Sequence, residues 1–166
     1  PATPAATNAI TAVASDPGTV YCGGTNLSEG RGTDRPFEQI GAPWLDAAAV
    51  AATMNAMGLP GIAFQAVTVS VAETAAKFPG QNIPAIRLAI TDRQAYRPVG
   101  TALVLIDTIR KQHPGEFAWG PSIDALTGSD QVRLAIDADR LAPLLAEWDR
   151  AAAQFRASRA GYLLYS

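Results

Sequence analysis

The sequence has few residues that could cross-link the fold or bind a metal. The single cysteine, Cys22, permits no internal disulfide, and the single histidine, His113, excludes the Cys and His clusters of structural zinc sites. No Ser, Cys or Asp stands in a recognisable catalytic-triad arrangement with His113. We therefore expect no metal and no cofactor.

Runs of like charge and long apolar runs are also absent. The 13 basic and 15 acidic residues are scattered and give a formal net charge of -2, which disfavours nucleic acid and anionic membrane surfaces as partners. Ala, Thr, Pro and Gly interrupt every apolar stretch before it reaches the roughly 18 to 20 residues that span a bilayer. We expect no membrane span.

The chain does have enough apolar material for one domain. Its 166 residues are 48% hydrophobic, which is sufficient to bury a sizeable core. The first residues, Pro1-Ala2-Thr3-Pro4, lack a starting Met and open a stretch rich in Ala, Thr and Pro. We interpret 1–19 as a linker-like segment and 20–166 as the domain.

Hydrophobic patterns and turn residues predict alternating strands and helices. Ser129 and Asp139 are expected to begin the last two helices. The predicted strands are 20–22, 62–71, 85–91 and 162–165, and the predicted helices are 45–57, 99–112, 129–136 and 139–157. This order indicates an α/β or α+β fold, with a single layer-type domain and a small mixed sheet flanked by helices.

A long glycine-rich loop, residues 23–43, concentrates the polar side chains. From Thr25 to Thr33 it carries hydroxyls, an amide, a carboxylate and a guanidinium, separated by glycines that let backbone amides approach a ligand. Its spacing fits neither a phosphate-binding P-loop nor a dinucleotide fingerprint. The loop suits a polyhydroxylated or anionic ligand, although the same side chains could equally serve only turn and cap hydrogen bonds.

Glu29 is the candidate catalytic carboxylate, because glycoside hydrolysis typically uses two carboxyl groups, one of them as general acid. The alternative is a solvated Glu paired with Arg31 or Arg35. These arginines could bind a ligand carboxylate through two parallel hydrogen bonds, or they could form structural ion pairs. The ring of Trp44 could stack on a sugar or pack in the core. The candidate substrate-binding residues are Thr25, Asn26, Ser28, Arg31, Thr33, Arg35 and Trp44.

The string GGTNLSEGRGTDRPFEQIGAPW resembles the signature of the bacterial peptidoglycan exo-β-N-acetylmuramidase family, which reads EGTN-x-S-x-GRGT-x-x-PFE-x-x-GAPW. The resemblance continues through Thr91-Asp92-Arg93, Trp119 and Tyr162-Leu163-Leu164-Tyr165, and it covers nearly the whole chain. The family pattern has a Glu just before Gly-Thr-Asn, and we expect that position to be Gly24 in this chain.

The resemblance implies a two-part enzyme in which this chain is the C-terminal, substrate-facing domain. The N-terminal part would be a Rossmann-like domain with a Pro-Glu-His-Gly motif that supplies a catalytic Glu, and this motif does not occur here. By resemblance we expect a secreted or periplasmic hydrolase of cell-wall turnover. The chain alone would be inactive, would bind the non-reducing terminal N-acetylmuramic acid of peptidoglycan fragments, and would complete the active site with that partner domain. The alternatives are a non-catalytic carbohydrate-binding or interaction module derived from the enzyme, and a purely structural domain.

Overall fold

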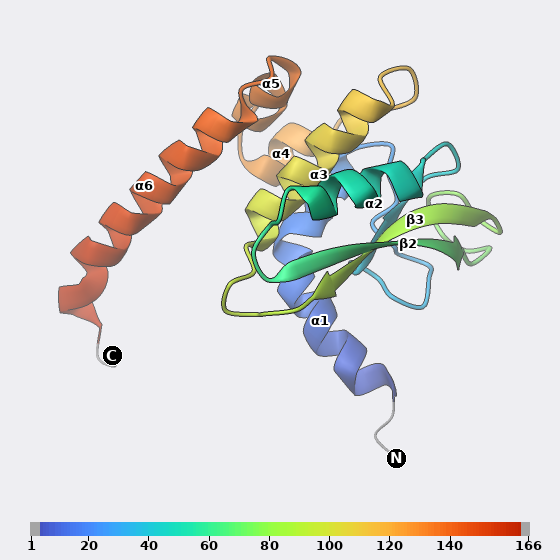
Figure 1. Cartoon of the computed structure of the whole chain (residues 1–166), viewed down its shortest axis with the longest axis horizontal. Helices are drawn as coiled ribbons and strands as arrows, with labels where there is room; N and C mark the ends of the chain where they lie inside the picture. Colours follow the sequence, from blue (N-terminus) through green and yellow to red (C-terminus); the bar gives the residue numbers. More distant parts are fainter. Residues whose placement is uncertain (1–3, 164–166) are drawn as a thin grey trace.

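A small sheet forms one layer of the molecule. The computed structural model describes residues 4–163, with side chains from residue 12 onward. Its strands are β1 (Gln39–Gly41), β2 (Ile62–Ser70) and β3 (Asn82–Ile90). They lie in the order β1-β3-β2, and both pairings are antiparallel. Figure 1 shows α2 and α3 on one side of the sheet and α6 reaching away from the body.

The core lies between the sheet and two helices, α2 (Ala47–Ala56) and α3 (Pro98–Gln112). Phe64 of β2 stands opposite Leu88 of β3, and both side chains are buried. Ile106 of α3 is fully buried in the same cluster. Burial of such side chains is the main favourable term in folding.

Helices α2 and α3 lie where they were predicted. Asp46 caps α2, because its Oδ1 accepts a hydrogen bond from the backbone N–H of Ala49 at 3.0 Å. Pro98 is the first residue of α3, a position that needs no backbone N–H. Basic side chains occupy the last turn of α3, where they favour the helix dipole.

The N-terminal segment is helical, whereas a linker-like segment was expected. Residues Pro4–Thr19 form α1, which packs on α3. A 3-10 helix, η1 (Val20–Gly24), replaces the predicted strand at 20–22. The segment is rich in Ala, the best helix former, and its turn signal at Pro17 falls in the last turn of the helix. The domain boundary at residue 19 stays a prediction.

In the described residues after α3, three α-helices follow, α4 (Ile123–Thr127), α5 (Gln131–Asp137) and α6 (Leu141–Arg159). The predicted start of the last helix at Asp139 is wrong by two residues. Asp139 has a φ of 52°, and its carboxylate lies 2.8 Å from the guanidinium of Arg110 on α3. It therefore ties the turn before α6 to α3.

The predicted strand at 162–165 is wrong in the part that the structure describes. Tyr162 ends a short 3-10 helix, η2 (Ala160–Tyr162), that follows α6. Leu163 belongs to no strand, and positions 164 and 165 lie outside the described residues. The apolar run resembles a strand, but no neighbouring strand pairs with its described part.

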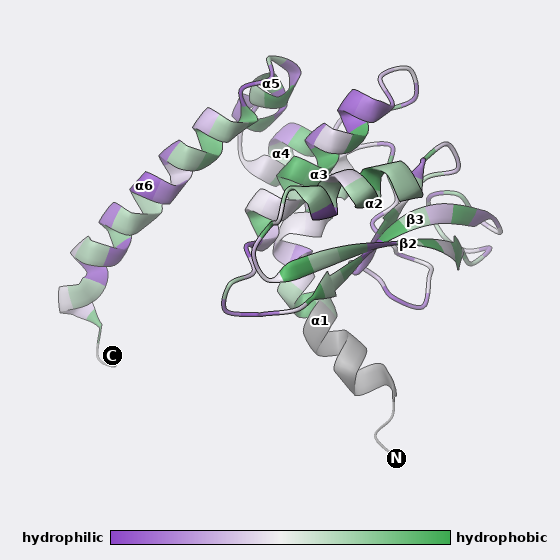
Figure 2. Cartoon of the chain, viewed as in Figure 1, coloured by the Kyte–Doolittle hydropathy of each residue, from purple (hydrophilic) through white to green (hydrophobic). Residues whose placement is uncertain are grey.

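Helix α6 reaches away from the body of the molecule (Figure 1), and Trp148 is its last residue that is not exposed. Leu141 is buried and Leu145 half-buried, whereas all residues from 149 to the end of the helix are exposed. Figure 2 shows hydrophobic and hydrophilic residues alternating along it. Within residues 4–163, no helix combines the length and the hydropathy needed to cross a membrane.

The predicted fold class, α/β or α+β with a single layered domain, is confirmed. The sheet is antiparallel throughout its described strands, so the expected mixed sheet needs correction. The reason is the short connection at 71–81, which joins β2 directly to β3. A parallel pair would need a longer crossover, usually a helix.

Candidate functional site

The polar loop and the β2–β3 connection enclose a pocket of about 430 Å³. One wall is formed by residues between 23 and 32, and the other by residues 74–77. The two walls are joined by a hydrogen bond that the backbone N–H of Ala72 donates to the carbonyl of Gly32, at 2.8 Å. Of the predicted site residues, Ser28, Glu29 and Arg31 line this pocket.

Among the described residues, Glu29 is the one carboxylate that lines the pocket. Its side chain is only 7% exposed, yet Oε2 accepts no hydrogen bond from any described residue. Oε1 lies 2.9 Å from Nη1 of Arg31, and Oε2 lies 3.5 Å from Nζ of Lys77. A buried carboxylate held by two cations and left with an unsatisfied oxygen can accept a hydrogen bond from a ligand.

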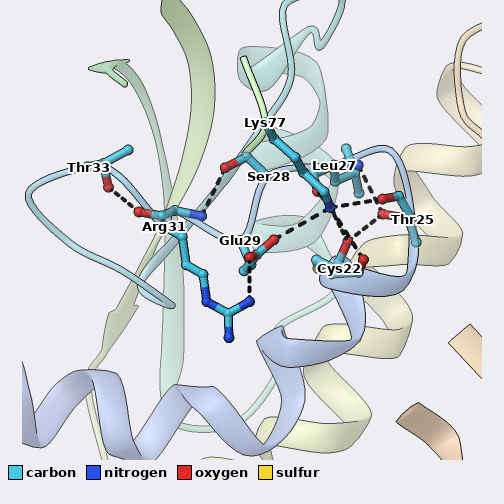
Figure 3. Close-up of polar contacts among 10 residues, drawn as sticks. Cys22, Thr25, Leu27, Ser28, Glu29, Arg31, Thr33 and Lys77 are labelled. Carbon is cyan, nitrogen blue, oxygen red and sulfur yellow. Dashed lines mark hydrogen bonds and ion pairs between the residues drawn. The ribbon is translucent and has the colours of Figure 1, made fainter. Parts of the chain in front are cut away.

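Lys77 was not among the predicted site residues. It comes from the β2–β3 connection, and Figure 3 shows its side chain reaching toward Glu29 and the carbonyls of Thr25 and Leu27. The side chains of Lys77 and Glu29 belong to segments about 50 residues apart. No local sequence signal could have found this pair, because only the fold brings the two segments together.

Thr25 and Asn26 hold the backbone of the loop in place. The hydroxyl of Thr25 donates to the carbonyl of Cys22 at 2.8 Å and accepts from the backbone N–H of Leu27 at 3.0 Å. The amide of Asn26 donates to the carbonyl of Glu116 at 2.7 Å and accepts from the backbone N–H of Ala118. Both side chains are therefore engaged within the protein.

Ser28 and Thr33 make the turn that follows. The Oγ of Ser28 accepts from the backbone N–H of Gly30 at 3.2 Å. The hydroxyl of Thr33 donates to the carbonyl of Gly30 at 2.6 Å and accepts from the side-chain amide of Gln39 at 2.7 Å. Ser28 faces the pocket as well as the turn, while Thr33 lies outside the pocket lining.

The two arginines have different surroundings. Arg31 stands at the mouth of the pocket with 62% of its side chain exposed, over the ring of Phe37 at 4.9 Å. Arg35 lies outside the pocket lining, 3.4 Å from Oε2 of Glu38. Burial raises the pKa of Glu38, and the Arg35 guanidinium offsets part of this rise. Arg31 is thus the arginine that is free to meet a ligand.

Trp44 lies outside the lining of this pocket. It packs against the hydrophobic core and, tilted, against the ring of His113 with 5.4 Å between the ring centroids. His113 in turn accepts a hydrogen bond at Nε2 from the backbone N–H of Asp46, at 3.2 Å. The structure therefore does not bring Trp44 together with Glu29 and Arg31, and its stacking role stays a prediction.

The glycine at the position of the family's Glu is Gly23, so the expectation of Gly24 is wrong by one residue. Gly24 is itself the glycine of Gly-Thr-Asn. A Cβ on Gly24 would meet the backbone of Ile123 at 2.7 Å, so it packs against α4. A Cβ on Gly23 would instead lie 3.9 Å from Oε2 of Glu29. A side chain at position 23 would therefore point into the pocket beside Glu29.

Gly32 fixes how closely the two walls approach. Its φ is +82°, and a Cβ there would meet the Cβ of Ala75 at 2.6 Å. We expect Gly32→Ala to lower the free energy of unfolding by about 1–3 kcal/mol, because it adds both backbone strain and a steric clash. Urea denaturation measures this. The control is Gly100→Ala in α3, where a Cβ meets nothing within 4 Å and a gain of about 0.4–1 kcal/mol is expected. Equal effects of the two changes would contradict the prediction.

A second depression on the surface fits a functional site less well. A depression of about 510 Å³ over β2 and the start of α2 has one ionisable side chain in its lining, the exposed Asp46. Among the described residues, no three His, Cys, Asp or Glu side chains lie close enough together to hold a metal ion. The Glu29 pocket, which holds a buried charge, is therefore the candidate site.

The chain matches known proteins over almost its full length. Residues 17–165 match the family model described as exo-β-N-acetylmuramidase NamZ, C-terminal. The peptidoglycan β-N-acetylmuramidase NamZ of Bacillus subtilis (strain 168) is 35% identical over 152 residues, which cover 90% of this chain and 36% of that protein. The chain thus spans about a third of the length of this relative.

A solved structure shares the fold. The DUF1343 family protein from Bacteroides fragilis NCTC 9343 superposes with a TM-score of 0.81 at 19% identity, covering 92% of this chain and 42% of that one. The resemblance read from the Gly-Thr-Asn to Gly-Ala-Pro-Trp signature is confirmed. This chain belongs to the family of C-terminal domains of the exo-β-N-acetylmuramidase NamZ.

Proposed function

We propose that this domain binds the non-reducing terminal N-acetylmuramic acid of peptidoglycan fragments in the Glu29 pocket. The observation that carries the proposal is the buried Oε2 of Glu29, which has no hydrogen-bond donor among the described residues and lies beside the exposed guanidinium of Arg31. A saccharide supplies hydroxyl and amide donors for the carboxylate oxygen. N-acetylmuramic acid adds a lactyl carboxylate that an arginine can bind.

Arg31 can serve Glu29 and a ligand at the same time. A guanidinium has five N–H donors in a fixed fork, and in this structure the contact with Glu29 is made through Nη1. The remaining donors stand at the pocket mouth, where 62% of the side chain is exposed. A ligand carboxylate can therefore form a bidentate, charge-assisted pair there.

A complete glycosidase site needs a second carboxyl group, and Glu29 is the one carboxylate in the pocket lining. We propose that the second one comes from an N-terminal partner domain, as in a two-part enzyme. The length of the Bacillus subtilis relative, of which this chain covers 36%, leaves room for such a domain. The assembly would be a hydrolase of the cell wall outside the cytoplasm.

Paired titrations by calorimetry test the binding proposal. Wild-type chain is titrated with N-acetylmuramic acid and with N-acetylglucosamine, which lacks the lactyl carboxylate. We expect the muramic acid to bind about 10-fold or more tightly, since a charge-assisted pair contributes about 1.5–3 kcal/mol. Arg31→Ala should remove this difference.

Arg93→Ala is the matched control, because Arg93 is an exposed arginine in the turn after β3 and outside the pocket lining. This variant loses the same charge and should keep the preference for muramic acid. Equal affinity of the wild-type chain for both sugars would contradict a role for the lactyl group. Turnover of a chromogenic muramide by the isolated chain would contradict the need for a partner domain.

A non-catalytic carbohydrate-binding module is the second candidate, and Gly23 favours it. The family pattern has Glu where this chain has Gly23, so this pocket has lost one carboxylate. The distinguishing experiment adds the N-terminal part of the Bacillus subtilis relative to this chain. Turnover of the muramide by the mixture supports the enzyme, whereas binding without turnover supports the module.

A further inference from the structure

The ammonium of Lys77 sits among backbone carbonyls of the polar loop. Its Nζ lies 3.3 Å from the carbonyl oxygen of Cys22, 3.4 Å from that of Gly23 and 2.9 Å from that of Thr25. It also donates to the carbonyl of Leu27. We call these four carbonyls the carbonyl cage. Figure 3 shows the amine at the point where they converge.

The carbonyl cage needs a positive charge at its centre. Four carbonyl dipoles from residues 22–27 turn their negative ends toward one point, an arrangement otherwise found around bound cations. Without a cation these dipoles repel one another, and the repulsion favours opening of the loop. Lys77 provides that charge from the β2–β3 connection, 50 to 55 residues along the chain.

The same ammonium sets the position of Glu29. Its Nζ stands 3.5 Å from Oε2, while the carbonyl cage offers more acceptors than its three N–H groups can serve. The carboxylate is thus attracted by the charge, yet its Oε2 accepts no hydrogen bond from any residue that the structure describes. This leaves the oxygen in place with an unused capacity to accept a hydrogen bond.

We infer that Lys77 is a positioning residue of the site, which acts as a built-in cation for the carbonyl cage and thereby holds Glu29 ready for the ligand. The inference rests on the proposed function where it concerns ligand binding. The role in shaping the loop stands on the contacts of Lys77 alone.

The first test removes the charge of Lys77 and keeps the approximate shape of its side chain. Lys77→Met should weaken binding of N-acetylmuramic acid 10-fold or more while circular dichroism reports a folded chain. Lys111→Met is the matched control, since Lys111 is the other lysine of the chain and pairs with Asp107 and Asp139 instead. This control should bind as the wild type does. Equal binding by Lys77→Met and the wild type would overturn the inference.

The second test restores the charge chemically. Lys77→Ala removes a propylammonium-sized group, so added propylammonium should restore saccharide binding, whereas 1-propanol, of similar shape without the charge, should not. A merely space-filling role predicts that both compounds act alike, and that result would overturn the inference. So would a folded Lys77→Ala variant that propylammonium leaves unchanged.

Hydrogen exchange separates this inference from the proposed function. The backbone N–H groups of Thr25 and Leu27 are bonded within the loop, and their protection should fall 10-fold or more in Lys77→Ala and return with propylammonium. This readout needs no saccharide. If the wild-type chain fails to bind the sugar but the protection changes as stated, the proposed function fails and the role of Lys77 stands. Unchanged protection overturns the role of Lys77.

Discussion

Glu29→Gln is expected to lower the affinity of the domain for N-acetylmuramic acid by roughly 10- to 100-fold. Hydrogen bonds to a charged group contribute about 1.5–3 kcal/mol, and the neutral amide removes that charge. The change also leaves Arg31 and Lys77 without the carboxylate that both contact. One of the two amide positions becomes a donor, with which an N–H donor of the ligand cannot pair. Calorimetry with the sugar measures the loss.

Glu73→Gln is the control for this result. Glu73 lies exposed in the same β2–β3 connection as Lys77 but outside the pocket lining. Glu73→Gln removes one carboxylate from the same part of the surface and should leave the affinity for N-acetylmuramic acid unchanged. Urea denaturation of both variants separates lost binding from lost stability. Wild-type affinity in Glu29→Gln would place the saccharide site elsewhere.

Cys22 is expected to react with iodoacetamide at pH 8 roughly 1000-fold or more slowly than glutathione does. The residue is 0% exposed, and burial raises the pKa of its thiol to about 12, with the charge of Glu29 adding to the rise. About one thiol in 10,000 is then ionised at pH 8, and the thiolate is the reactive form. The alkylation rate should therefore rise with pH, since the thiol pKa lies far above neutrality.

Mass spectrometry of quenched samples measures the reaction. In concentrated urea, which exposes the thiol and returns its pKa to the ordinary range, Cys22 should react as glutathione does. Labelling of the native chain at the glutathione rate would show that the loop around Cys22 opens often. Because the carbonyl of Cys22 belongs to the carbonyl cage, faster labelling in Lys77→Met would report the same opening.

Local signals were sufficient for the elements with clear ends. Asp46 and Gly58 bound α2, and Pro98 starts α3, as capping and proline rules predict. These signals failed where the composition favours a helix but Pro and Gly favour a turn. Pro17 and Gly18 read as a turn, yet the preceding alanines and the packing on α3 carry the helix through them.

Of the candidate pocket, the sequence predicted only one of the two walls. Glycine spacing and the polar side chains of residues 23–33 located the loop, with Glu29 and Arg31 in it. Lys77 belongs to a stretch of Thr, Ala and Lys with no motif of its own, and only the β2–β3 pairing brings it to the loop. Trp44 ends the same polar segment, but it is only partly buried, packs against the core and lies outside the pocket lining.

The carbonyl cage also constrains the order in which parts of the domain fold during synthesis. Its charge comes from a residue 50 to 55 positions later than the carbonyls it organises, and closing a loop of that size is slower than forming local helices. During synthesis the polar loop therefore leaves the ribosome well before residue 77 and cannot take its final shape until the β2–β3 hairpin has emerged and paired. In the nascent chain the Glu29 pocket would therefore stay incomplete until that hairpin has formed.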